Sequence, residues 1–150
     1  MNTEDLPIQE ETASREVVQF EQAVKEVAKW LDYKKIPPEV RVASQKSIVN
    51  LAFAISRGEL ILMENLDLKY PLKFPLLGEK GSVIATELVF RPRLSIEDVN
   101  EQQAKAMSNS GKYNVYVIYA SALTKQPLTI INKIDTTDYS LLQDIVTFFL

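Results

Sequence analysis

Few residues of this chain have the types and the spacing that catalysis requires. The sequence contains no histidine and no cysteine, which removes the commonest general base near neutral pH, thiolate nucleophiles and the commonest transition-metal ligands. Hydrolase triads of the usual kind are therefore excluded, and only enzymes built from carboxylates, lysine or tyrosine remain. We predict no catalytic residue, no cofactor and no metal site, which favours a binding or assembly role.

Two pairs of polar residues stand at predicted helix starts. Asp135 and Asp138 are three residues apart, and so are Ser95 and Asp98. A side-chain oxygen at a helix start accepts hydrogen bonds from free backbone N–H groups, and a carboxylate there faces the positive end of the helix dipole. We therefore interpret both pairs as helix caps, and not as metal ligands or an acid pair.

The segment Arg91-Pro-Arg93 follows a predicted strand. Guanidinium groups bind oxyanions at two points, so these arginines could clamp a phosphate or an acidic partner. The simpler interpretation is an exposed strand end whose arginines pair with surface acids. No glycine-rich phosphate loop and no zinc-protease motif accompanies them in the sequence.

Tyr113, Tyr116 and Tyr119 recur at a spacing of three. Such a row of rings could stack nucleic-acid bases, dock a partner or line the edge of the core. The net charge of −3 disfavours nucleic acid, because sequence-independent binding draws most of its affinity from neutralised phosphates. We expect a core edge or a protein contact.

The N-terminal third of the chain predicts an acidic arm followed by two helices. Residues 1–13 are acidic and without periodicity, which is typical of a flexible arm. From Ser14 onward, apolar residues recur at spacings of three and four, as in an amphipathic helix. This stripe consists of Val17, Phe20, Val24, Val27 and Leu31. A second stripe ends at Gly58, so residues 14–58 predict a helical hairpin.

The rest of the chain, residues 59–150, predicts a small α+β domain. Residues 66–74 and 83–90 are strand-like and flank a turn that contains two glycines, which indicates an antiparallel β-hairpin. Residues 58–63 are expected to add a third strand. Short helices are expected over residues 96–107, 113–123 and 128–134, with a turn at 109–112 and a last helix after Asp135. The overall prediction is an α+β fold with a C-terminal bundle of short helices.

The last ten residues contain seven large apolar side chains, up to Leu150. Either they pack back onto the hairpin, or they form an exposed patch that binds another hydrophobic chain. Together with the first helical stripe, they supply most of the candidate partner-binding residues, which are Val17, Phe20, Val24, Val27, Leu31, Arg91, Tyr116, Ile145, Phe148, Phe149 and Leu150.

The order of these segments resembles the tail assembly chaperones of contractile-tailed phages, the family typified by phage Mu and by protein E of phage P2. The resemblance covers residues 66–150 and rests on short segments. They are the leucine, basic, proline, leucine strand at 68–72, Thr-Glu-Leu-x-Phe-Arg at 86–91, Asp98, Ala-Leu-Thr at 122–124 and the Asp-x-x-Asp-Tyr run ending at Tyr139. The family usually has glycine where this chain has Lys125, and the first 65 residues have no counterpart in it.

The resemblance implies a non-catalytic protein that covers apolar stretches of the long helical tape measure protein while a phage tail is built. Members of that family are often made in two lengths by ribosomal frameshifting, and the resemblance implies that this chain could be the shorter form. The helical hairpin would then be a second client surface or a self-association surface. A different hypothesis is a structural subunit that stays in the finished tail or injection particle, where it would be stoichiometric. An enzyme built from carboxylates and tyrosines ranks last.

The sequence also bears on where the protein works. Its acidic start lacks the apolar run of a secretory signal, and its longest uncharged stretch, residues 113–124, is shorter than the roughly 20 residues that span a bilayer. We therefore predict a cytoplasmic protein without membrane contact, in the host cytoplasm if a phage encodes it.

Overall fold

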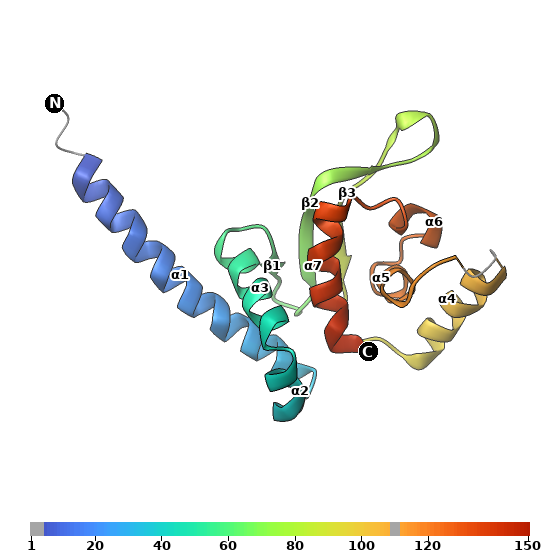
Figure 1. Ribbon diagram of the computed structural model, residues 1–150, viewed down its shortest axis with the longest axis horizontal. Helices are drawn as coiled ribbons and strands as arrows, with labels where there is room; N and C mark the ends of the chain where they lie inside the picture. Colours follow the sequence, from blue (N-terminus) through green and yellow to red (C-terminus); the bar gives the residue numbers. More distant parts are fainter. Residues whose placement is uncertain (1–4, 109–111) are drawn as a thin grey trace.

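A computed structural model describes residues 5–108 and 112–150 of the chain, with the backbone alone for residues 5–18. The fold is mixed α+β, as predicted, and its sheet lies between the N-terminal helices and helices α4 to α6 (Figure 1). In chain order the elements are α1 (Asp5–Tyr33), α2 (Pro38–Ala43), α3 (Gln45–Ser56), β1 (Ile61–Leu62), β2 (Leu68–Leu77), β3 (Val83–Phe90), α4 (Ile96–Ser108), α5 (Val115–Thr124), α6 (Leu128–Ile131) and α7 (Thr136–Val146), with short 3-10 turns at Glu79–Gly81 and Thr147–Phe149.

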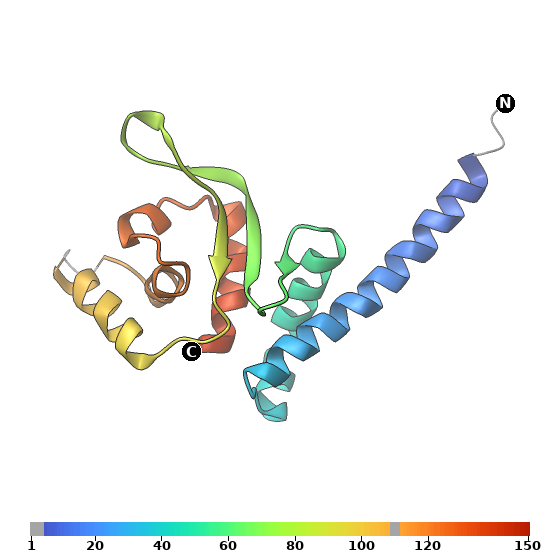
Figure 2. The same ribbon diagram turned by 180° about the vertical axis from the view of Figure 1, so that it is seen from behind.

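Helix α1 is longer than the sequence predicts. It begins at Asp5 and not at Ser14, so residues 5–13 of the predicted flexible arm are helical, while residues 1–4 lie outside the described residues. Pro7 falls within the first turn, where backbone N–H groups have no acceptor in the helix, so its missing N–H costs no helical hydrogen bond. Figures 1 and 2 both show this end of α1 projecting away from the rest of the fold.

The predicted helical hairpin is formed by α1 and α3, which pack against each other. The second helix of the hairpin is divided at Ser44, whose φ of −108° and ψ of 25° separate α2 from α3. Its N–H still donates to the Val40 carbonyl, so the chain bends at this point without leaving the hairpin. Gly58 follows the end of α3 with a φ of +75°, the left-handed conformation that makes glycine a common helix terminator.

The three strands form one antiparallel sheet in the order β1-β2-β3. The predicted β-hairpin is therefore confirmed, and the expected third strand is present as the two residues of β1, which pair with the start of β2. The register of β2 against β3 shifts between Pro71 and Leu76. The stretch between them holds more residues on β2 than on β3, so its backbone groups cannot all pair across the sheet.

Helices α4 to α7 confirm the four helical segments predicted after the β-hairpin. The predicted turn at residues 109–112 lies outside the described residues except for Lys112. Helix α5 is the buried helix, in contact with α4, α6, α7 and β3. The side chain of Asn114 begins it by accepting a hydrogen bond of 3.0 Å from the Val117 N–H.

The two ends of the fold meet in one hydrophobic core. The Phe148 ring lies edge-on to the buried Trp30 ring of α1, with centroids 5.8 Å apart, and the Phe149 ring lies 5.9 Å from it. The last residues therefore pack back onto the helical hairpin, and only Leu150 remains largely exposed. Burying a side chain of this size contributes roughly 1.5 to 3 kcal/mol.

Candidate protein-binding surface

Asp138, predicted to cap α7, is instead a fully buried carboxylate that binds β2. It accepts hydrogen bonds from the Tyr70 hydroxyl at 2.5 Å and from the backbone N–H groups of Lys73 and Phe74, both at 3.0 Å. Asp135 is the residue that caps α7, through a 2.8 Å bond from the Thr137 N–H. The capping prediction is thus right for Asp135 and wrong for Asp138.

The register shift in β2 explains why a carboxylate lies there. Lys73 and Phe74 belong to the stretch that has no regular partners on β3, and a buried N–H without an acceptor costs about 1 to 3 kcal/mol. The Asp138 carboxylate supplies the acceptors, and three donors in turn offset the burial of its charge. Burial, and then the hydrogen bond to Asp138, raise the pKa of the Tyr70 hydroxyl above its ordinary value.

The outer part of the β2-β3 hairpin carries exposed apolar side chains. We call it the arm tip and define it as Phe74, Leu77, Val83 and Ile84, whose exposed fractions are 53%, 45%, 59% and 47%. Leu77 and Val83 are cross-strand partners, so their side chains share one face. Figure 1 shows that this end of the hairpin extends beyond the helices, which leaves it open to a partner.

Gly78 shapes the turn at the arm tip. A Cβ atom at this position would come within 2.7 Å of the Ile84 Cδ1, so the absence of a side chain lets Ile84 lie against the backbone of the turn. Sequence reasoning missed the arm tip as a site. The alternation of apolar residues predicts a hairpin, but it does not show which end of the hairpin the helices leave uncovered.

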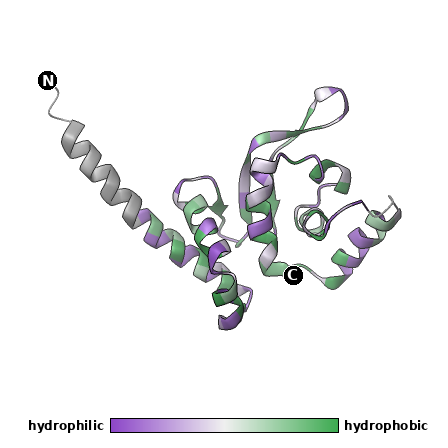
Figure 3. Ribbon diagram, in the orientation of Figure 1, coloured by the Kyte–Doolittle hydropathy of each residue, from purple (hydrophilic) through white to green (hydrophobic). Residues whose placement is uncertain are grey.

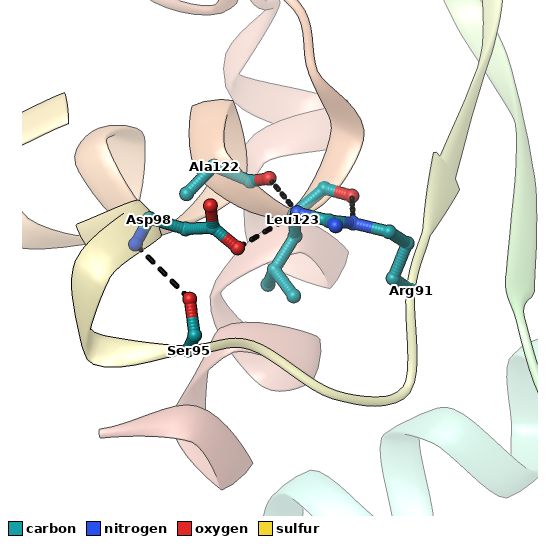
Figure 4. Close-up of polar contacts among 5 residues, drawn as sticks. All are labelled: Arg91, Ser95, Asp98, Ala122 and Leu123. Carbon is teal, nitrogen blue, oxygen red and sulfur yellow. Dashed lines mark hydrogen bonds and ion pairs between the residues drawn. The ribbon is translucent and has the colours of Figure 1, made fainter. Parts of the chain in front are cut away.

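Arg91 lies at the C-terminal end of α5 (Figure 4). Its Nη2 donates to the Ala122 carbonyl at 2.7 Å, and its Nε donates to the Leu123 carbonyl at 3.3 Å. The last carbonyls of a helix lack partners and carry partial negative charge, so a guanidinium group stabilises this end. Arg91 also lies 3.6 Å from Asp98. The Asp98 N–H donates to the Ser95 Oγ at 3.2 Å, so half of the reciprocal cap predicted for this pair is present.

A cleft of about 620 Å³ lies between α4 and the connection from α5 to α6. Arg91 and Asp98 line it, as do Glu101 and Lys105, which form a 3.5 Å ion pair along α4. The Glu101–Lys105 pair lies within α4, whereas Arg91 connects Asp98 of α4 to the last carbonyls of α5. Among the side chains that the structure describes, those of residues 19–108 and 112–150, no group of three acidic residues is placed to hold a metal ion.

Four of the predicted partner-binding residues belong to the core. Val27, Leu31, Ile145 and Phe148 are each less than 5% exposed, so they offer no surface to a partner, which corrects the prediction at these positions. Helix α1 is amphipathic as expected, but its buried apolar side chains face α3 and the C-terminal residues of the same chain.

The other predicted residues whose side chains the structure describes are partly or largely exposed. The Phe20 ring packs on Phe53 with centroids 4.6 Å apart, and the Tyr116 ring lies edge-on to Tyr139 at 6.4 Å. Phe149 is partly buried under Lys34, whereas Val24 and Leu150 are 40% and 60% exposed. The side chain of Val17 lies outside the described residues.

A second hollow, of about 340 Å³, is lined by positively charged side chains beside the end of α1. Lys34, Lys35 and Arg93 line it together with the rings of Phe148 and Phe149. The Lys34 Nζ donates to the Pro92 carbonyl at 3.1 Å and lies 3.3 Å from the centroid of the Phe149 ring. Burial, and then the neighbouring Arg93, lower the pKa of Lys34 to about 8.

Comparisons of this chain with protein-family models, with curated proteins and with solved structures found no match. The resemblance to tail assembly chaperones therefore stays a prediction from the residues quoted above. Among the residues that the structure describes, no helix is both long enough and apolar enough to cross a bilayer.

Asp138→Asn is expected to lower the free energy of unfolding by about 2 to 4 kcal/mol, because an amide has one acceptor oxygen and turns an N–H group toward the remaining donors. Asp135→Asn is the matched control and is expected to change it by less than about 0.5 kcal/mol, since asparagine caps helices as well as aspartate does. Urea unfolding of both variants measures the difference. Equal effects would contradict the role assigned to Asp138.

Arg91→Met is expected to cost about 1.5 to 3 kcal/mol of stability, because it removes charge-assisted hydrogen bonds to the end of α5. Arg93→Met, two residues along the same segment, is the control. It removes a cation that faces Lys34, so we expect no loss of stability from it. Thermal unfolding at matched ionic strength compares the two variants, and a smaller loss for Arg91→Met than for Arg93→Met would refute this assignment.

Lys34→Met is expected to reduce the rise of stability with alkaline pH. The folded-state pKa of about 8 lies below the ordinary lysine pKa of 10.5, so between these values the unfolded chain binds more protons and the wild type gains stability as pH rises. Urea unfolding from about pH 8 to about pH 9.5, below most tyrosine ionisation, measures the slope of each protein. Parallel slopes for wild type and variant would show that Lys34 is not the titrating group.

Proposed function

We propose that this protein is a non-catalytic assembly factor that binds an apolar surface of another polypeptide through its arm tip. The observation that carries the proposal is the exposure of four large apolar side chains at the projecting end of the β-hairpin. Leu77 and Val83 share one face of the hairpin, and exposed apolar surface of this kind marks interaction sites on soluble proteins. Removing it from water contributes about 25 cal/mol for each Å² buried.

The part of β2 that leads to the arm tip supports this role because its backbone is held in place. Asp138 fixes the backbone at Lys73 and Phe74, so the side chain of Phe74 points outward from a strand whose position is set by α7. A preorganised surface loses less conformational entropy on binding than a mobile loop does. Reversible burial of this surface needs no reacting group.

The resemblance to tail assembly chaperones supplies the identity of the client. We propose that it is the tape measure protein, a long helical polypeptide whose apolar stretches need cover before a tail is complete, and that binding takes place in the cytoplasm. The backbone at Lys125 fits the family pattern, although the residue type does not. Lys125 stands where the family usually has glycine, and its φ of +59° is the left-handed conformation that glycine favours.

The test is co-expression with a tape measure protein, the long helical client that this proposal names. Wild-type protein carrying an affinity tag is expected to retain the long protein through purification. Leu77→Thr combined with Val83→Thr is expected to reduce the retained amount about tenfold, because both substitutions replace apolar contact surface with a hydroxyl group and a combined loss of about 1.4 kcal/mol is a factor of ten in affinity. Threonine keeps the β-propensity of the strands.

The matched control is Val42→Thr, which replaces a valine that is 76% exposed on α2. We expect this variant to retain the client as the wild type does. A wild type that does not retain the long protein, or equal retention by all three proteins, would rule out binding through the arm tip. Circular dichroism and thermal unfolding verify that each variant is folded.

A further inference from the structure

The hollow beside the end of α1 is lined by cations and by apolar side chains. We call it the basic hollow, after the three cations Lys34, Lys35 and Arg93. Its other described lining residues are apolar or aromatic, and none of them is an acid. Positive charges that share one small hollow disfavour one another, so an anion placed among them is bound favourably.

Two acids that lie close to these cations in the sequence are paired elsewhere. The Asp32 carboxylate lies 2.9 Å from Arg41, and the Asp98 carboxylate lies 3.6 Å from Arg91. Neither arginine lines the basic hollow, so both carboxylates are drawn toward cations outside it.

Lys34 retains hydrogen-bonding capacity for a ligand. Its ammonium group has three N–H donors, and in the described part of the chain it donates to the Pro92 carbonyl at 3.1 Å and lies 3.3 Å from the centroid of the Phe149 ring. A carboxylate accepts a charge-assisted hydrogen bond, which is stronger than a contact with a ring face. Burial and Arg93 lower the pKa of Lys34 to about 8, and an anion beside both groups would oppose this shift.

We propose that the basic hollow binds an acidic segment of another polypeptide, in which an aspartate or glutamate stands next to an apolar residue. The carboxylate lies between Lys34 and Arg93, and the apolar neighbour packs on Ile96, which lines the hollow and is 71% exposed. The volume of about 340 Å³ lies at the lower end of the range of about 300 to 1,000 Å³ that ligand sites occupy.

The apolar lining favours a polypeptide over the other anionic ligands. An inorganic ion would contact the cations and gain nothing from Ile96. A membrane surface is disfavoured, because polybasic clusters that bind anionic lipids contain about four to eight cations, whereas this hollow has three and the chain has a net charge of −3. A segment that combines a carboxylate with an apolar side chain matches both parts of the lining.

The basic hollow lies far from the arm tip. Phe148 and Phe149 line it, and Figures 1 and 2 show the adjacent C-terminus at the end of the fold opposite the outer end of the β2-β3 hairpin. The two surfaces therefore contact different segments of a partner or different partners. Binding at the basic hollow does not depend on the function proposed for the arm tip.

Fluorescence anisotropy of a peptide that carries a neutral dye tests the proposal on the full-length protein. The probe is the blocked peptide Leu-Asp-Phe-Glu-Leu. Its matched control, Leu-Asn-Phe-Gln-Leu, keeps the size and the apolar residues but has no charge. We expect the wild type to bind the acidic peptide about tenfold more tightly, because hydrogen bonds to an ionised acceptor are roughly twice as strong as those to a neutral one.

Lys34→Met and Arg93→Met are each expected to weaken binding of the acidic peptide about fivefold, because each removes one cation from the carboxylate. Binding of the amide peptide should not change. Lys105→Met, which removes an exposed lysine near the other end of α4, is the matched control and should bind as the wild type does. Arg93 is exposed, so its variant tests the site even if Lys34→Met does not fold, and thermal unfolding verifies each variant.

Each alternative ligand gives a different result, and each of these results overturns the proposal. Equal affinity for the two peptides, or equal binding of the acidic peptide by all three variants, would show that the cations of the hollow do not select it. Displacement of the peptide by sodium phosphate at the peptide's own concentration would indicate a site for an ion alone. Co-sedimentation of the wild type, but not of Arg93→Met, with phosphatidylserine vesicles would indicate a membrane contact. None of these results bears on the arm tip, because Leu77 and Val83 are unchanged in every variant.

Discussion

The buried carboxylate of Asp138 connects α7 to β2, two elements that are far apart in the sequence. A charge without solvent is tolerated in a protein only when donors surround it, and here the donors are one tyrosine hydroxyl and two N–H groups of an irregular strand. These three bonds have two effects. They give acceptors to the N–H groups of β2 that have no partner on β3, and they hold α7 against the sheet. The direction in which the arm leaves the fold depends on them.

Other contacts between distant segments complete this frame. Trp30 receives the rings of Phe148 and Phe149, so the two ends of the fold share one core. Asp144 of α7 accepts hydrogen bonds from Ser47 and Asn50 of α3, and burial raises the pKa of its carboxyl group. Arg91 joins the end of β3 to the end of α5. The centre of the fold is therefore held by specific bonds as well as by apolar packing.

The outer end of the β2-β3 hairpin extends beyond this frame (Figure 1). The arm tip presents apolar side chains on a strand pair with a fixed root, which suits the burial of a client's apolar surface.

Local signals in the sequence predict most of the helices and strands. Apolar spacings of three and four predict α1 and α3, alternation predicts the β2-β3 hairpin, and Asp135 marks the start of α7, because these signals depend on neighbours along the chain. Tertiary structure alone decided which apolar residues are covered, burying Val27 and Phe148 while leaving Val24 and Leu150 exposed. It also decided the role of Asp138. An acid in the first turn of a helix has the same sequence signature whether it caps that helix or binds a strand 65 residues away, since its donors are brought to it only by folding.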